Sequence, residues 1–277
     1  ESMFHPHMDG DELGDKHTSR IPSKGLYGHE FRKNAVSKDT GKVVVPVRYS
    51  FRSFDRQWII PDNRLLNRPN PTFWESFSDS QVYAISLEKR APSNGPAITF
   101  AGYLPDLNFY KGSSGGRVFP LWADRDTATP NIKPALLEAV GKEIGLPVTA
   151  QGFMAYLAAI AAHPAYTKRF RADLVQPGLR IPITSNVNLF REAVAIGEEV
   201  IWLHTFGERF VDSSKDRSAS PPRLPKGQGP IIPKDGAIPT DPDLMPNEIS
   251  HDPVTVSYTH LRAHETDSYL VCRLLLE

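Results

Sequence analysis

The chain has almost no sulfur chemistry and no long apolar run. Its 277 residues include one cysteine, Cys272, which excludes intrachain disulfides and cysteine-rich zinc modules. No run of about 18 apolar residues occurs, which argues against a transmembrane helix. The N-terminal residues lack the charged and then apolar pattern of a secretory signal peptide. These absences lead us to expect a cytoplasmic protein.

The chain also lacks an excess of charge of either sign. Lys and Arg together number 32, and so do Asp and Glu. No overall field would therefore attract the protein to a polyanion or an anionic membrane, and any such contact needs a local basic face. With 40% hydrophobic and 23% charged residues, the composition is typical of a globular protein of one large or two small domains.

The ATP-loop motif GxxxxGK[ST] is absent as well. A GxSxG match occurs once, at residues 112–116, but this Gly-rich loop has no clear strand-then-helix frame, and nothing in the sequence ties His163 or His204 to it. We interpret both histidines as helix-end or core residues.

Five short segments rich in β-branched and aromatic residues predict strands. They are residues 43–49, 57–60, 81–87, 97–104 and 117–122. Pro120 lies in the last of them and predicts an edge strand or a strand end, because proline cannot donate to a sheet ladder. The first half of the chain is therefore predicted to be rich in β-structure.

From residue 131 the apolar spacing becomes helical. The first predicted helix carries Leu136, Leu137, Val140 and Ile144 and stops at Gly145. The second buries Phe153, Leu157 and Ile160 and ends near His163. The third is basic and covers residues 165–174. A last helix has Asn188 as its expected cap and a stripe of Leu189, Ala193, Ile196, Val200 and Leu203. The fold class is therefore α+β, with a β-rich N-terminal part, a helical part and a Pro-rich C-terminal extension.

The composition divides the chain into four parts. Residues 1–42 read as a polar loop or the remnant of an upstream domain, and residues 43–212 as the α+β domain. Residues 213–255 read as a Pro-rich linker or truncated segment. Residues 256–277 resemble a translated sequencing adapter and are expected to be non-native. We expect both ends of the chain to be truncations.

Two local motifs suggest ligands. His5, His7 and Asp9 resemble the HxHxD loop of metallohydrolases, but no second ligand motif accompanies them, and we interpret them as part of a polar terminus. The Gly-rich loop from Lys111 to Arg117 offers backbone N–H groups between two cations. It is interpreted either as a solvated hairpin or as a loop that reaches a phosphate backbone.

A second candidate surface interleaves cations with aromatic rings. Arg48, Arg52 and Arg56 alternate with Phe51, Phe54 and Trp58. Such residues can contact phosphates, guanine edges and exposed bases. Alternatively the aromatic residues are core, and the arginines pair with Asp55 and other carboxylates.

The third helix and the following turn carry a further basic cluster. Lys168, Arg169 and Arg171 lie largely off the apolar face, and Arg180 follows a Pro-Gly turn. Charge runs of this kind are commonly a solvated helix face. They are also the residue types that contact nucleic-acid backbones.

The order of motifs in residues 153–206 resembles the C-terminal specificity region of type ISP restriction-modification enzymes and related adenine-specific DNA methyltransferases. The matching positions are Tyr156, Ala162-His163-Pro164, Tyr166, Arg169-Phe170, Arg180-Ile181-Pro182, Phe190, Gly197 and Leu203-His204. The segment from Phe51 to Asp55 resembles the block that precedes this region in those enzymes.

The resemblance implies a target recognition fragment that binds double-stranded DNA. It implies DNA contacts at Arg48, Arg52, Arg56, Lys111, Arg117, Lys168, Arg169, Arg171 and Arg180. Its partners would be DNA and the upstream methyltransferase and helicase parts of the same polypeptide, with no membrane partner.

Catalysis is expected elsewhere. Adenine methylation needs a methyl-donor loop and an [DNS]PP[YFW] motif, and Asn70-Pro71-Thr72-Phe73 lacks the second proline. We therefore expect no catalytic residue, metal or cofactor in this chain. S-adenosylmethionine, and ATP with Mg²⁺ in full type ISP enzymes, are implied for the parent. Two alternatives stay open: a structural module docked on the methyltransferase core, and an unrelated metal-dependent hydrolase.

Overall fold

The computed structural model describes residues 26–32, 40–42, 44–66, 70–87, 96–106, 109–110, 116–175 and 179–220, and the backbone of 251–252 and 257–258. The HxHxD-like segment, Lys111 and most of the Pro-rich and tail segments lie outside these ranges. The expectations for them stay predictions. None of the described helices combines the length and the apolar character needed to traverse a lipid bilayer.

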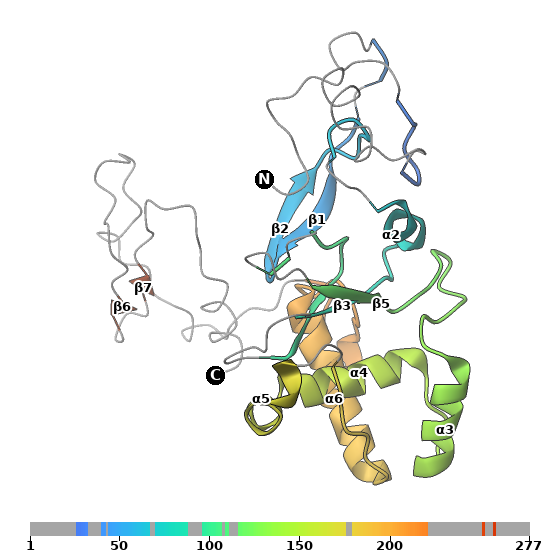
Figure 1. Ribbon diagram of the computed structural model, residues 1–277, viewed down its shortest axis with the longest axis vertical. Helices are drawn as coiled ribbons and strands as arrows, with labels where there is room; N and C mark the ends of the chain where they lie inside the picture. Colours follow the sequence, from blue (N-terminus) through green and yellow to red (C-terminus); the bar gives the residue numbers. More distant parts are fainter. Residues whose placement is uncertain are drawn as a thin grey trace.

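A two-stranded antiparallel ribbon opens the folded part (Figure 1). Strand β1 (Val47–Arg52) pairs with β2 (Asp55–Ile59). Phe54 in the connecting turn has a φ of 59°, a left-handed conformation that side chains rarely adopt. Tyr49 and Ile59 are buried, so one face of the ribbon packs on the rest of the domain.

The central sheet has three antiparallel strands in the order β4-β3-β5. These are β3 (Tyr83–Ser86), β4 (Ile98–Ala101) and β5 (Arg117–Pro120). Pro120 ends an edge strand, as predicted. Side chains alternate across the sheet, so Tyr83 and Ile85 face one hydrophobic cluster while Ala84 and Phe100 face another.

Four helices make up most of the second half of the described chain. They are α3 (Pro134–Ile144), α4 (Ala150–Ala162), α5 (Pro164–Arg169) and α6 (Val187–His204). Gly145 ends α3 with a φ of 74°, the left-handed cap expected of glycine. The basic helix is shorter than predicted: Phe170 caps it, and the 3₁₀ turn η3 (Asp173–Val175) follows.

The remaining elements are short. Helix α2 (Pro71–Ser76) precedes the sheet and is capped by the side chain of Asn70. A 3₁₀ turn, η4 (Ser213–Lys215), follows α6. Two-residue strands β6 (His251–Asp252) and β7 (Ser257–Tyr258) pair with each other.

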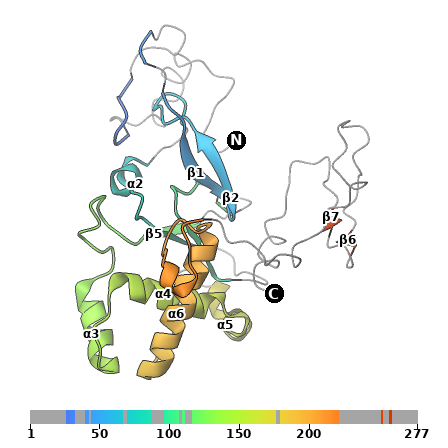
Figure 2. The ribbon, with the colours of Figure 1, turned by 180° about the vertical axis from the view of Figure 1, so that it is seen from behind.

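The domain has three layers, with the central sheet in the middle. The ribbon and α2 lie on one side of the sheet, and the helices α3 to α6 lie on the other (Figures 1 and 2). Helices α4 and α6 cross in close contact. A Cβ added at Gly197 would clash with the backbone carbonyl of Ala155, so only glycine fits at this crossing.

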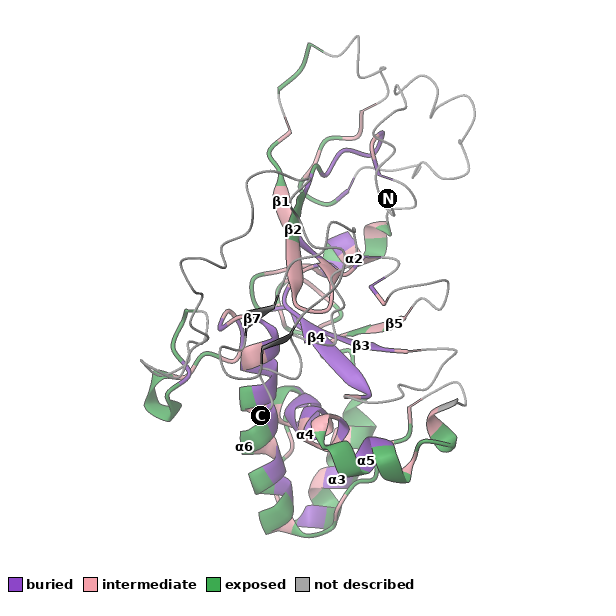
Figure 3. Cartoon of the chain, turned by 90° about the vertical axis from the view of Figure 1, so that its left-hand side faces the viewer, coloured by how far each residue is buried: buried purple, intermediate pink, exposed green. Residues whose placement is uncertain are grey.

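The buried stripe of α6 matches the predicted one only in part. Ala193 and Val200 are buried as predicted, but Leu189 and Ile196 are 53% and 57% exposed, while Phe190, Gly197 and Ile201 are buried. Figure 3 shows the buried and exposed faces of this helix. The predicted cap was also wrong, because Asn186 rather than Asn188 accepts the first backbone N–H groups. The crossing at Gly197 fixes which side of α6 packs inward, and the predicted stripe lies only partly on that side.

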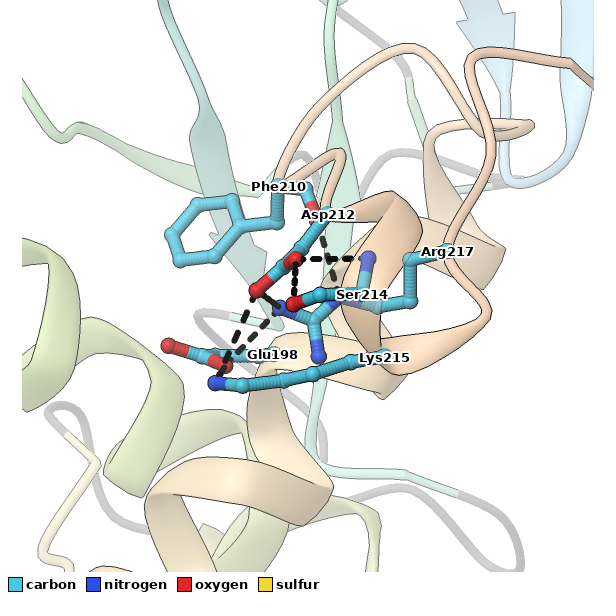
Figure 4. A network of polar contacts seen from close by, with 6 residues as sticks. All are labelled: Glu198, Phe210, Asp212, Ser214, Lys215 and Arg217. Atoms are coloured by element: carbon cyan, nitrogen blue, oxygen red, sulfur yellow. Dashed lines mark hydrogen bonds and ion pairs between the residues drawn. The ribbon is translucent and has the colours of Figure 1, made fainter.

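The chain folds back on α6 after the helix ends (Figure 4). Arg217, with a side chain only 7% exposed, donates from Nη2 to Glu198 at 2.9 Å and from Nε to the carbonyl of Phe210 at 2.9 Å. Lys215 adds a second contact to Glu198 at 3.2 Å. The indole N–H of Trp202 donates to the carbonyl of Ser218 at 2.9 Å. Packed structure therefore continues beyond residue 212, where we expected a linker to begin.

Candidate nucleic-acid interface

Two of the predicted cations hold the ribbon in place. Arg52 donates to the buried carboxylate of Asp106 at 3.2 Å. Arg56 is hydrogen-bonded to Glu208 and lies 3.9 Å from the ring centroid of Phe206. Both arginines therefore pair with carboxylates, as the second interpretation of this segment expected, and the carboxylates are Asp106 and Glu208. Both arginines attach the ribbon to segments distant in sequence, and DNA contact by either one stays a prediction.

Of the aromatic residues on the ribbon, one packs against the rest of the domain and another is exposed. Phe54 lies edge-on against His204, with ring centroids 4.9 Å apart, and so joins the ribbon to the end of α6. Trp58 is 59% exposed and is not a core residue. Arg48, its cross-strand partner, has its guanidinium carbon 4.2 Å from the indole centroid.

Arg117 belongs to the central sheet and not to the ribbon or α5. It is exposed at the start of β5 and is paired in register with Ser86. Lys111, at the other end of the same loop, lies outside the described residues.

Four predicted cations lie on α5 and on the segments next to it. Lys168, Arg169 and Arg171 are exposed at the end of this helix, and Arg180 is exposed on the segment that returns beside it. We call these four residues the basic corner. The buried residues Tyr166 and Thr167 anchor the helix from its inner side.

Two tyrosines fix the returning segment against the helices. Tyr166 donates its hydroxyl proton to the carbonyl of Arg180 at 2.7 Å. Tyr156 donates to the carbonyl of Pro182 at 2.8 Å and accepts from the backbone N–H of Thr184 at 3.0 Å. The backbone from Arg180 to Thr184 is thereby held at three points, and Arg180 is placed next to α5.

The tyrosines are themselves held in the core. Tyr156 stacks on Phe190, with centroids 4.7 Å apart and planes 14° apart. Burial raises the pKa of both Tyr156 and Tyr166, so both hydroxyls stay protonated donors at neutral pH. The motif tyrosines therefore have a positioning role, which the spacing of the motif alone did not reveal.

The basic corner has little negative charge around it. Residues 164–186 contain its four cations and a single carboxylate, Asp173. Within the part of the chain that the structure describes, no carboxylate lies within ion-pair distance of any of the four. A locally positive surface of this kind can contact phosphate oxygens without first breaking internal pairs.

Both candidate histidines are structural, as predicted. The Nδ1 atom of His163 accepts from the backbone N–H of Ala165 at 3.1 Å and caps α5. The Nδ1 atom of His204 accepts from the backbone N–H of Phe100 at 3.2 Å, and burial lowers the pKa of His204 to about 4. No group of three or more possible metal ligands occurs among the described residues.

Comparison with known proteins assigns the family. The model of the Type ISP C-terminal specificity domain matches residues 19–274. No curated protein matches the chain.

Three solved structures are similar to parts of this chain. A DrdV-DNA complex is 20% identical with a TM-score of 0.48, over 65% of this chain and 17% of that one. The ATP-dependent Type ISP restriction-modification enzyme LlaBIII bound to DNA is 17% identical, with a TM-score of 0.47, over 61% of this chain and 11% of that one. A nuclease-deletion mutant of the Type ISP restriction-modification enzyme LlaGI in complex with a DNA substrate mimic is 21% identical, with a TM-score of 0.45, over 61% of this chain and 14% of that one.

This chain thus spans less than a fifth of each of those polypeptides. The family match, by contrast, covers nearly all of it and includes both the ribbon and the basic corner. The chain belongs to the family of Type ISP C-terminal specificity domains.

Proposed function

We propose that this chain binds double-stranded DNA as the target recognition part of a larger type ISP-like restriction-modification enzyme or adenine-specific DNA methyltransferase. The observation that carries the proposal is the basic corner. It is a cluster of four exposed cations without described carboxylate partners, in a chain whose total charge is zero. The DNA-bound state of the three similar structures supports the same function.

The mechanism follows from the chemistry of the cluster. Lys168 and the arginines neutralise phosphates along the backbone, which sets the register of the protein on the duplex. Arginine can also pair with the O6 and N7 atoms of guanine in the major groove. Arg180 is the side chain best placed for this task, because the tyrosine contact at its carbonyl restrains its backbone.

Bond-making chemistry belongs to other parts of the parent polypeptide, which are the proposed protein partners of this domain. S-adenosylmethionine would supply the methyl group there, and ATP with Mg²⁺ would drive DNA translocation and cleavage in a full type ISP enzyme. The described residues of this chain offer no cluster of metal-ligating side chains, so no catalytic step is assigned to it. The proposed location is the cytoplasm, where the DNA substrate lies.

Binding of a DNA duplex at several salt concentrations tests the proposal. Fluorescence anisotropy with a labelled duplex should show affinity that falls steeply as salt rises, because phosphate contacts release counterions. Charge reversal by Arg169→Glu with Arg171→Glu should weaken binding at least about tenfold. It should also reduce the slope of log affinity against log salt by about 2.

A matched control separates the basic corner from net charge. Lys142→Glu with Arg191→Glu makes the same charge change at exposed positions of α3 and α6 and should leave binding within about twofold. Equal losses in both double variants, or none in either, would contradict the proposed interface. Unchanged binding in the variant with Arg169→Glu and Arg171→Glu would instead favour the alternative in which this chain is a structural module docked on the methyltransferase core.

A further inference from the structure

Trp58 is exposed where the other tryptophans of the chain are not. Trp74 and Trp202 are buried and Trp122 is half-buried, whereas Trp58 is 59% exposed. An indole stabilises a fold mainly through the burial of its apolar surface, so an indole that stays in water contributes little to the free energy of folding. The fold therefore does not account for a tryptophan at this place.

The exposed indole is oriented by an arginine. Arg48 and Trp58 are directly opposite each other across β1 and β2, with the guanidinium over one ring face at 4.2 Å. We call this pair the stacking platform. Among the described residues, Arg48 has no carboxylate partner and donates no side-chain hydrogen bond, whereas Arg52 and Arg56 of the same ribbon are paired.

The ribbon beneath the platform is fixed. Ile59 is 1% exposed and Tyr49 is 7% exposed, and both pack into the cluster under the ribbon. Arg56, the next residue along the same face of β2, is bound to Glu208 in the segment after α6. A rigid support lowers the entropic cost of binding a ligand on the platform.

We propose that the stacking platform binds a nucleobase that lies outside a base-paired stack, with its phosphate on Arg48. A flat ring with an attached anion matches an indole face beside a guanidinium that has free donors. An apolar protein surface would leave those donors without acceptors, so the observations favour the nucleotide. The inference rests on the proposed DNA-binding function and adds a second, chemically distinct contact to it.

Binding of two matched duplexes by the full chain tests the proposal. One duplex is fully paired, and the other has the same sequence with one unpaired adenine. The unmodified protein should bind the second duplex about tenfold more tightly, which corresponds to about 1.4 kcal/mol. Trp58→Ala should remove this preference and leave the paired duplex within about twofold, while Trp58→Phe should retain part of it.

The variants keep this inference separate from the proposed function. Arg169→Glu with Arg171→Glu should weaken both duplexes alike and preserve the preference. The platform is ruled out when Trp58→Ala weakens both duplexes equally or leaves the preference intact. An equal affinity of the unmodified protein for both duplexes also rules it out, and the face would then suit a protein partner.

If the protein does not bind the paired duplex, the proposed function is contradicted but the stacking platform is not. Tryptophan fluorescence then tests the platform separately. A single-stranded oligodeoxyadenylate should still quench emission of the unmodified protein, and Trp58→Phe should lose that quenching. No quenching in the unmodified protein would overturn the inference as well.

Discussion

At the scale of the residue, His204 couples stability to pH. Its neutral imidazole accepts a hydrogen bond from Phe100 inside the core, and burial lowers its pKa from 6.5 to about 4. Above pH 6.5 the folded and unfolded forms are both neutral. As the pH falls from 6.5 toward 4 the unfolded form binds the proton first, so stability is lost over this window. The loss should reach about 3 kcal/mol, measured by urea unfolding between pH 7 and pH 4.

A variant isolates this contribution from the carboxylates that titrate nearby. His204→Asn should be less stable than the unmodified protein at pH 7 and should show a smaller loss between pH 6.5 and pH 4. Identical pH profiles for the two proteins would contradict a buried neutral imidazole at position 204.

At the scale of the element, the tyrosine contacts join α4 and α5 to the segment that carries Arg180. Tyr166→Phe removes the hydrogen bond to the carbonyl of Arg180 and keeps the buried ring. We expect a loss of about 1 kcal/mol in unfolding free energy. Duplex binding should weaken about threefold, because the guanidinium of Arg180 is held less firmly. Urea unfolding and fluorescence anisotropy measure the two effects.

Tyr27→Phe provides the comparison, since Tyr27 is 49% exposed and its hydroxyl makes no hydrogen bond with a described residue. Both measurements should be unchanged in that variant. A Tyr166→Phe protein that loses stability but binds duplex normally would show that the tyrosine supports the fold without positioning Arg180.

The same scale shows where sequence reasoning succeeds. Five strands were identifiable because β-branched and aromatic residues cluster between turn residues. Strands β3, β4 and β5 lie within the predicted ranges, β1 and β2 overlap theirs, and the two-residue strands β6 and β7 were not predicted. Gly145 and Pro120 also behave as their backbone chemistry requires. Local signals of this kind depend on neighbours in the chain and can be read from it directly.

Contacts between distant segments could not be predicted in this way. Arg56 finds Glu208, 152 residues away, and no local pattern distinguishes that carboxylate from Asp55. On α6 more apolar positions satisfied the helical period than the helix buries, and the close crossing of Gly197 against Ala155 fixes the side that packs inward, so that Leu189 and Ile196 stay exposed. The basic corner was predicted as a set of cations, but the tyrosine contacts that assemble it depend on the tertiary fold.

At the scale of the whole molecule, the return segment after α6 sets the extent of the folded domain. Arg217 is nearly buried against Glu198 and the carbonyl of Phe210, and Ser218 accepts from the indole of Trp202. A chain that ends at residue 211 loses all of these contacts, whereas one that ends at residue 220 keeps them.

The shorter chain should therefore be less stable by at least about 1 kcal/mol, which lowers the melting temperature by about 2–4 °C for a domain of this size. Arg217→Ala in the 277-residue chain tests the same contacts without truncation and should lower the melting temperature in the same direction. Lys215→Ala is the comparison, because its side chain is 54% exposed and surface ion pairs contribute little. Equal melting temperatures for the two truncated chains would place the end of the domain at α6 and reduce the return segment to a surface contact.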